Sequence, residues 1–517
     1  MSLKINTEQI CSRETLCRIT HEQSVELDYV LPDYYPEIFR VIRCTASPSV
    51  TSCTVNGDRL AYELSVVLKI IYCGSSGNDL RTVERRLDYS RTADLECGGT
   101  SPRVRITPSV EYVNCRAVTG RRIDVRGAVS IAIAVTGETC REAVSDAFGC
   151  GILLKKTSVS CPSPAIISEK RVTVSETFPL GEAKPPVADV LRCCAAVTSS
   201  DRKLIGDKLA AKGELKINML YTAASENGNT PETMQFSLPF SQIMDMNGID
   251  DRYETYENIS VLSCDIRPRS DGSGDAREVE CEVLLLICCT AVKYNELSLA
   301  SDEFSTACAT EHVSEPIKLS LPPVVVDQTR VISGSAEQHE GNIGTVYDVW
   351  CEVMSCDTLR EEDGSITAAG RACCYCLAQS TGGEPVICTA DVPFRFEGIS
   401  SGGLSADASA DISAVPVSCS YNLTSDNSVE IKAELRLTGE ICDFRRINVL
   451  TSVTADEENI PQSDSDAAVK LYFASKGEDL WDIAKQCRTS PEAIMEENGL
   501  DEPVMQENGM IIIPIIR

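Results

Sequence analysis

The sequence predicts a mainly β protein of tandem antiparallel repeats, sandwich-like or barrel-like, followed by a small α+β module. Apolar and polar residues alternate over long stretches, which is typical of strands with one buried face. The alternating pattern recurs three times along the 517 residues. The stretch from Val469 to Arg517 instead carries signals for two capped helices between two strands. A chain of this length is enough for three or four domains of about 100–200 residues each.

The first repeated element is a long strand that starts at Leu60 and ends at Tyr72, with an apolar residue at every even position. Its second copy is Leu209–Tyr221 and its third is Ile366–Cys376. Turn signals precede the copies, including Asn56-Gly57 and Asp363-Gly364. Repetition at this scale predicts one structural unit used three times.

A second strand type closes each repeat. Its copies are Ile123–Val135, Val279–Ile287 and Val429–Leu437, and all three alternate with period two. Such strands suit an antiparallel sheet with one face on a core and one face in water. We therefore expect three β domains, at 20–150, 165–310 and 315–455, the third being degenerate in the segment that enters its first strand.

The acidic segment 456–467 contains Ser and Pro and has little to bury. It is typical of a flexible tether, so we expect the C-terminal module at 468–517 to move relative to the repeats.

The C-terminal module has the predicted order β-α-α-β. Asp479 precedes the first helix as an N-cap. Ser490 and Pro491 begin the second helix, and Gly499 can adopt the left-handed conformation that ends it. We expect four apolar residues of the helices to form its core: Leu480, Trp481, Ile483 and Ile494.

The run Gly477–Lys485, with Ser490–Ile494, Glu497–Leu500 and Asn508–Pro514, resembles a LysM domain. The resemblance implies a shallow groove that binds N-acetylglucosamine-containing glycans, between the loop before the first helix and the loop after the second. Carried over by position, the groove residues are Gly477, Glu478, Asp479, Leu480, Asn498, Gly499, Leu500, Asp501 and Glu502.

A second resemblance lies near the N-terminus. The acidic-apolar strand from Val25, then Leu31-Pro-Asp33 and Pro36-Glu-Ile38, resemble the start of a SPOCS domain, a β domain of spore-forming Firmicutes. SPOCS domains with a terminal LysM are the arrangement of a spore coat morphogenetic family. This implies that the LysM module binds the coat morphogenetic ATPase called stage IV sporulation protein A, or other coat proteins, at the forespore surface in the mother-cell cytoplasm.

Charge and hydropathy exclude several classes of partner. The formal net charge of -29 repels phosphate backbones, so we expect no nucleic acid. The longest apolar runs, such as Val283–Cys289, are far shorter than the ~20 residues of a membrane span. The first ten residues lack the apolar run of a signal peptide, so we expect a cytoplasmic protein.

The 26 cysteines alternate with apolar residues inside strands, so we expect free thiols that replace valine or alanine. Cys373 and Cys376 have a CxxC spacing, but in a strand they point to opposite faces. We expect no metal, cofactor or catalytic site, because His21, His312 and His339 lie in predicted connectors or domain edges and none opens a recognisable motif.

Two functions stay open at this point, and an enzyme with an unrecognised site is a third, weaker hypothesis. The leading hypothesis is a non-enzymatic scaffold in spore coat assembly. The alternative is a protein that binds peptidoglycan or spore-cortex glycan through LysM, with the β repeats as spacers.

Overall fold

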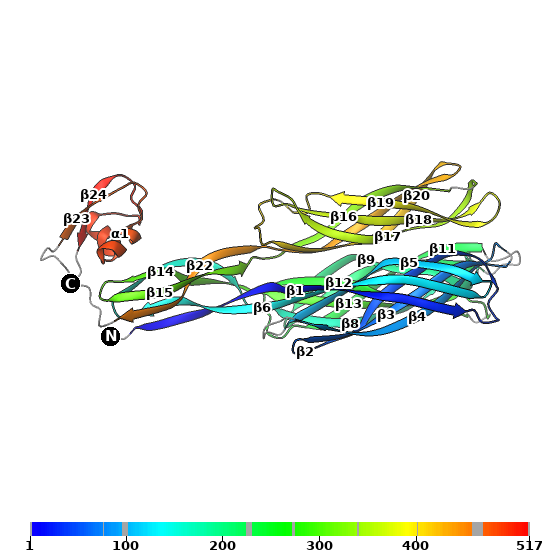
Figure 1. The fold of residues 1–517 in the computed structure, drawn as a ribbon, viewed down its shortest axis with the longest axis horizontal. Helices are drawn as coiled ribbons and strands as arrows, with labels where there is room; N and C mark the ends of the chain where they lie inside the picture. The colour runs from blue at the N-terminus through cyan, green and yellow to red at the C-terminus, as the bar shows by residue number, and fades with distance from the viewer. Residues whose placement is uncertain are drawn as a thin grey trace.

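The computed structural model describes residues 3–514, except for 76, 96–101, 224–229, 271–273, 339–340, 401 and 457–468. All strand pairs of the described residues are antiparallel, and none of their sheets closes into a barrel. The repeats are therefore open two-sheet sandwiches. Figure 1 shows their strands gathered at one end of the molecule, with β14, β15 and β22 extending toward the C-terminal module at the other end.

The first unit has two three-stranded sheets. One has the order β2 (Ile38–Asn56), β3 (Arg59–Gly74), β4 (Leu80–Asp94), and the other β1 (Lys4–Val30), β6 (Arg122–Phe148), β5 (Arg103–Thr119). The middle strands are the two that the alternation predicted. Their inward side chains, such as Leu64, Leu68 and Ile131, are fully buried in one core between the sheets.

The second unit repeats this order. Its strands are β8 (Ile166–Pro179), β9 (Val187–Ile205), β10 (Lys208–Ala223), β11 (Thr230–Asp245), β12 (Glu254–Arg269) and β13 (Glu278–Val292). Here β10 lies between β9 and β11, and β13 lies between β8 and β12. The predicted strands again take the middle positions.

The third unit has the same order, although its sequence pattern is the weakest. Its strands are β16 (Val324–Glu337), β17 (Ile343–Arg360), β18 (Ile366–Ser380), β19 (Pro385–Phe396), β20 (Ser409–Ser425) and β21 (Ser428–Cys442). Here β18 lies between β17 and β19, and β21 lies between β16 and β20. On β18 the buried side chains are small, since Ala372, Cys374, Cys376 and Ala378 are fully buried.

The strands that enter and leave each unit form a two-stranded ribbon. The first half of β1 pairs with the second half of β6, β7 (Ile152–Pro162) pairs with β14 (Tyr294–Ser305), and β15 (Ala309–Ser320) pairs with β22 (Phe444–Asp456). The three ribbons share a core in which Val144, Ala300 and Leu450 have no exposed surface. We call this part of the molecule the stalk.

Each ribbon has a β-bulge at the same position, one residue after that buried residue. The bulged residues are Ser145, Ser301 and Thr451. Their hydroxyls donate to backbone carbonyls of the paired strand, over 3.2 Å, 3.1 Å and 3.3 Å respectively. The stalk thus repeats threefold, as the units do.

The units contact one another in a ring. Arg40, Asp189 and Asp348 are equivalent, since each lies opposite the residue that follows Tyr72, Tyr221 or Cys376 on the middle strand. Arg40 donates to the Pro385 carbonyl of the third unit, and Asp189 accepts from the Thr82 N–H of the first unit over 3.0 Å.

Asp348 completes the ring by facing Arg192 of the second unit at 3.8 Å. Burial raises the pKa of Asp348 to about 6, and the Arg192 charge offsets only part of this effect. A nearby apolar cluster also combines side chains from all three units, including Leu80, Leu191 and Trp350.

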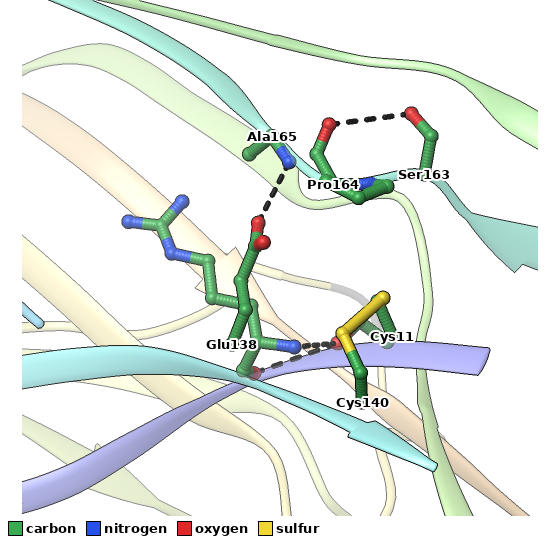
Figure 2. Close-up of a disulfide and its surroundings, with 8 residues drawn as sticks. Cys11, Glu138, Cys140, Ser163, Pro164 and Ala165 are labelled. Carbon is green, nitrogen blue, oxygen red and sulfur yellow. Dashed lines mark hydrogen bonds between the residues drawn. A yellow bond between two sulfur atoms is a disulfide. The ribbon is translucent and has the colours of Figure 1, made fainter. Parts of the chain in front are cut away.

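The expectation of free cysteines is wrong for one pair, because Cys11 and Cys140 form a disulfide across the β1–β6 ribbon (Figure 2). The two residues are register partners with Cα atoms 4.2 Å apart, a separation that the alternation of apolar residues does not reveal. Among the described residues, Cys281, Cys289, Cys374 and Cys376 are free thiols. Cys281, Cys289, Cys374 and Cys376 are fully buried, as predicted for thiols that replace small apolar side chains.

Candidate binding groove of the C-terminal module

The C-terminal module has the predicted β-α-α-β order. It consists of β23 (Val469–Ala474), α1 (Leu480–Cys487), α2 (Pro491–Asn498) and β24 (Gly509–Pro514). The Asp479 carboxylate accepts from the Trp481 N–H at 2.9 Å, and the Ser490 hydroxyl accepts from the Ala493 N–H at 3.0 Å. Gly499 ends α2 with a φ of 61°. These caps confirm the helix boundaries that the sequence predicts.

The four predicted core residues of the helices are buried: Leu480, Trp481, Ile483 and Ile494. Leu480 is therefore not available as a side-chain contact in the groove. Its backbone N–H donates to the Pro503 carbonyl at 2.8 Å. The predicted role of Leu480 in the groove is limited to its backbone position.

The loop before α1 pairs with a segment just beyond the predicted second loop. The Gly477 N–H donates to the Met505 carbonyl at 2.8 Å, and the Met505 N–H donates to the Glu478 carbonyl at 2.9 Å. These bonds hold the loop before α1 against residues 503–505. The predicted groove residues after α2 lie immediately before this contact.

Asn498 is a structural residue of the module. Its side-chain amide donates to the carbonyls of Ile494 and Ile512, at 2.8 Å and 2.7 Å, and its Oδ1 accepts from the Ile512 N–H at 2.7 Å. These bonds tie α2 to β24 and use both ends of the amide. In the second loop, Leu500 packs on the core, whereas Gly499, Asp501 and Glu502 are exposed.

Both acidic residues of the first loop have partners inside the molecule. The Glu478 carboxylate accepts from the Tyr472 hydroxyl at 2.6 Å and from the Ser475 N–H at 2.8 Å, and these bonds lower its pKa. Burial opposes ionisation of Asp479, but hydrogen bonds from Lys155 and from the Trp481 N–H outweigh it and lower the pKa. Both groups are therefore carboxylates at neutral pH.

The module packs against the β7–β14 ribbon of the stalk, a contact that the sequence analysis did not foresee. Asp302 of β14 accepts from the Trp481 indole N–H at 2.8 Å and from the Lys485 ammonium at 2.6 Å. The rings of Phe304 and Trp481 meet edge to face with centroids 4.9 Å apart. Lys155 of β7 pairs with Asp479.

In this structure the helix α1 contacts the stalk through these residues, and the mobility of the module stays a prediction. The predicted tether itself lies outside the described residues, except for Asp456, the last residue of β22. The sequence carries a repeat around Asp302, although this repeat does not specify a partner on the module. Ala143-Val-Ser-Asp146 and Leu299-Ala-Ser-Asp302 repeat, and the aspartates follow the bulged serines.

The described histidines lie in strands rather than in connectors. The His21 ring on β1 is 3.0 Å from the Tyr62 hydroxyl, and the His312 ring on β15 is 2.8 Å from the buried carboxylate of Glu303. His339 lies outside the described residues. Among the described side chains, no group of three or more His, Cys, Asp or Glu residues is arranged to hold a metal ion. None of the helices that the structure describes is long and apolar enough to span a membrane.

Comparison with known families agrees with this architecture. A family model described as SipL, SPOCS domain, matches residues 37–118 and 186–267, which are the β2–β5 region of the first unit and the corresponding β9–β12 region of the second. The LysM domain model matches residues 475–514. A search of curated proteins found no match, and a search of solved structures found none either.

The chain is thus a protein of tandem SPOCS domains with a C-terminal LysM domain, which associates it with sporulation and with a peptidoglycan-binding module. Neither family is one of enzymes. In domain content the chain is SipL-like.

Proposed function

We propose that this chain is a non-enzymatic scaffold of the spore coat, whose LysM module docks a coat morphogenetic protein at the forespore surface in the mother cell. The observation that carries the proposal is the presence of SPOCS domains and a LysM domain on one chain, with the module in contact with the stalk through Asp302. A module in contact with the stalk, together with three β units, offers several binding surfaces for partner proteins on one chain. Weak contacts that act together on one chain raise the effective concentration of each partner.

The charge of the candidate groove favours a protein partner. Exposed Asp501 and Glu502 lie in the second loop, and the ionised carboxylate of Glu478 lies in the first, where Asp479 is already paired with Lys155. An acidic rim attracts a basic protein surface and speeds its association. The coat morphogenetic ATPase, stage IV sporulation protein A, is the partner that the family resemblance suggests.

Glycan binding is the second candidate, and the LysM match favours it. The exposed groove residues Gly499, Asp501 and Glu502 are accessible from solvent, and carboxylates accept hydrogen bonds from sugar hydroxyls. Under this candidate the module would hold peptidoglycan or spore-cortex glycan. The β units would then act as spacers.

A binding experiment with the full chain separates the two candidates. We expect capture by the purified coat ATPase, and a loss of affinity of roughly tenfold or more in the double variant Asp501→Lys, Glu502→Lys, which corresponds to about 1.4 kcal/mol. The matched control is Glu492→Lys, Glu496→Lys, which reverses two exposed charges on α2 outside the groove. The control should bind as the wild type does.

Retention on insoluble peptidoglycan without capture by the ATPase would reverse the order of the two candidates. Equal losses of affinity in the groove variant and in the control variant would show that the groove does not bind the partner. A fluorescent fusion followed through sporulation tests the proposed location.

A further inference from the structure

In every unit the second and fifth strands meet where the two sheets come together. These pairs are β2 with β5, β9 with β12, and β17 with β20. Within the part of the chain that the structure describes, the paired strands belong to different sheets and share no backbone ladder. We call this meeting place the corner of the unit. Only side chains join the two sheets there.

The corner of the second unit holds two thiols in contact across the sheets. One of them, Cys264, also bonds to a third thiol, Cys281, on the neighbouring strand β13 of its own sheet. The thiols of Cys193 on β9 and Cys264 on β12 share a hydrogen bond, and the Cys193 sulfur lies 3.3 Å from the Cys264 carbonyl oxygen. Both residues are half-buried. Cys194, the next residue along β9, points to the opposite face of the strand and does not compete for this contact.

The other two units place thiols at the same corner. In the first unit Cys44 on β2 shares a hydrogen bond with Cys115 on β5, and both are half-buried. In the third unit Cys351 on β17 bonds instead to Cys374, its ladder partner on β18 of the same sheet, and Cys419 lies on β20. Cys44, Cys193 and Cys351 are equivalent, because they lie opposite Ile70, Met219 and Cys374 on the middle strands.

Replacement of valine by cysteine accounts for isolated thiols in this protein but not for these pairs. Cys161, for example, is buried alone among apolar residues of the stalk. A single substitution needs no second thiol on a strand of the other sheet. The thiol pairs that cross the corner in the first two units therefore call for a role that uses two sulfur atoms.

The pair in the second unit lines a large cavity. A central cavity of about 2250 Å³ lies between the three units, and its lining includes Cys44, Cys193 and Cys264. The hydrogen bond from Cys264 lowers the pKa of Cys193 to about 7, against the opposing effect of burial. Thiolate is the reactive form in thiol–disulfide exchange, so Cys193 is the better nucleophile of the pair.

We propose that Cys193 and Cys264 are a disulfide-forming pair that reacts with a low-molecular-weight disulfide through the central cavity, with Cys44 and Cys115 as the counterpart in the first unit. The Cys193 thiolate attacks one sulfur of the reagent, forms a mixed disulfide and releases one reagent thiolate. Cys264 then attacks the Cys193 sulfur and releases the second. The two protein thiols are oxidised, the reagent is reduced to two thiols, and the two protein protons end on those thiols.

Such a disulfide would join β9 to β12 covalently, at the place where no backbone bonds join the sheets. Cross-linking residues that are far apart in the chain restricts the unfolded state and so stabilises the fold. Oxidation would therefore fasten the two sheets of a unit without changing its strand order. The Cys11–Cys140 disulfide lies on a ladder pair of the stalk and serves as an internal reference (Figure 2).

The test treats the native full-length chain with oxidised glutathione, blocks remaining thiols and maps linked peptides by mass spectrometry. We expect a Cys193–Cys264 linkage first and a Cys44–Cys115 linkage later, with two glutathione molecules released for each pair. The variant Cys264→Ser should stop at a stable glutathione adduct on Cys193. The oxidised wild type should also melt at a higher temperature, and reductant should reverse this shift.

Cys161→Ser is the control, because that thiol has no sulfur partner at a corner; its linkages should equal those of the wild type. A persistent glutathione adduct on Cys193 in the wild type would overturn the proposal. The proposal would also be overturned if oxidised glutathione left Cys193 and Cys264 unmodified in the native chain but reacted with them in the urea-unfolded chain.

Discussion

The third unit and the first two share one strand order but have different cores. At equivalent positions of the middle strand, the first two units have Tyr72 and Tyr221, whose hydroxyls donate to the carbonyls of Pro36 and Pro185 over 3.4 Å and 3.2 Å. The third unit has Cys376 there, fully buried and without such a bond to an entry segment. The residues that match the family model all lie outside the third unit.

The difference shows which features the fold requires. Alternation with period two, a middle strand with partners on both sides and a ring of contacts between units persist in all three copies. The tyrosine and the proline-rich entry segment do not. The third unit therefore has the strand order of the first two units without their tyrosine and entry segment, and the family model does not match it.

The largest expected effect comes from the middle strands. Tyr221→Ala removes a fully buried aromatic ring and its hydrogen bond, so we expect a loss of about 3–5 kcal/mol in unfolding free energy. Cys376→Ala at the equivalent position removes only a sulfur atom and should cost about 1 kcal/mol. Urea unfolding measures both losses of unfolding free energy, and hydrogen exchange in each unit assigns each loss to its unit. Equal costs would mean that the two cores are packed alike.

The second effect compares two ribbons of the stalk. Asp302→Ala leaves the Trp481 indole N–H and the Lys485 ammonium without their shared acceptor, so we expect the module contact to weaken by about 1–3 kcal/mol. Asp146→Ala, at the equivalent position, removes only a half-exposed pair with Lys156 and should leave the module in place. Hydrogen exchange of α1 in the full chain reports the difference. Unchanged exchange of α1 in Asp302→Ala would contradict the role of this contact.

The third effect concerns the ring of contacts and depends on pH. The pKa of Asp348 is raised to about 6 by burial, whereas an unfolded aspartate titrates near 3.9. Between these values the folded state binds more protons than the unfolded state, so stability falls as pH rises from about 4 through about 6. We expect Asp348→Asn to remove this decline, which is about 3 kcal/mol over the whole window.

Melting temperatures of wild type and Asp348→Asn between pH 4.5 and 7.5 measure the effect. Asn keeps the size of the side chain and removes only the charge. Parallel pH curves for the two proteins would show that Asp348 does not carry the buried charge assigned to it.

The smallest effect tests the threefold repeat of the stalk. Ser145→Ala and Ser301→Ala each remove one hydroxyl bond from a bulge, and we expect losses of about 0.5–1.5 kcal/mol for each. Because the two bulges are equivalent, the losses should be similar. Thermal unfolding of the two variants makes the comparison, and a large loss in only one of them would argue against equivalent ribbons.

Much of the fold could be predicted from the sequence, because the middle strands carry the clearest alternation. All six middle strands of the units were predicted from the sequence. They are β3, β10 and β18 in one sheet of each unit, and β6, β13 and β21 in the other. The stalk was not predicted, since its strands continue those of the units or lie in predicted connectors. Its pairing depends on which distant segments enter and leave a unit, and alternation along one strand does not contain that information.

The candidate groove could be predicted only in part. Helix caps are local, so Asp479, Ser490 and Gly499 were placed correctly from short motifs. Asn498 was assigned to the groove, but its amide bonds to Ile494 and Ile512 within the module. The docking of the module on Asp302 and Phe304 joins segments about 180 residues apart, which no local pattern specifies.

Native-state hydrogen exchange of the full chain, resolved by strand, is the most direct test of three units built on one plan. The account predicts that β3, β10 and β18 are the slowest segments of their units, because each is bonded on both sides. Exchange of β18 at the rate of exposed loops, with β3 and β10 still protected, would contradict it.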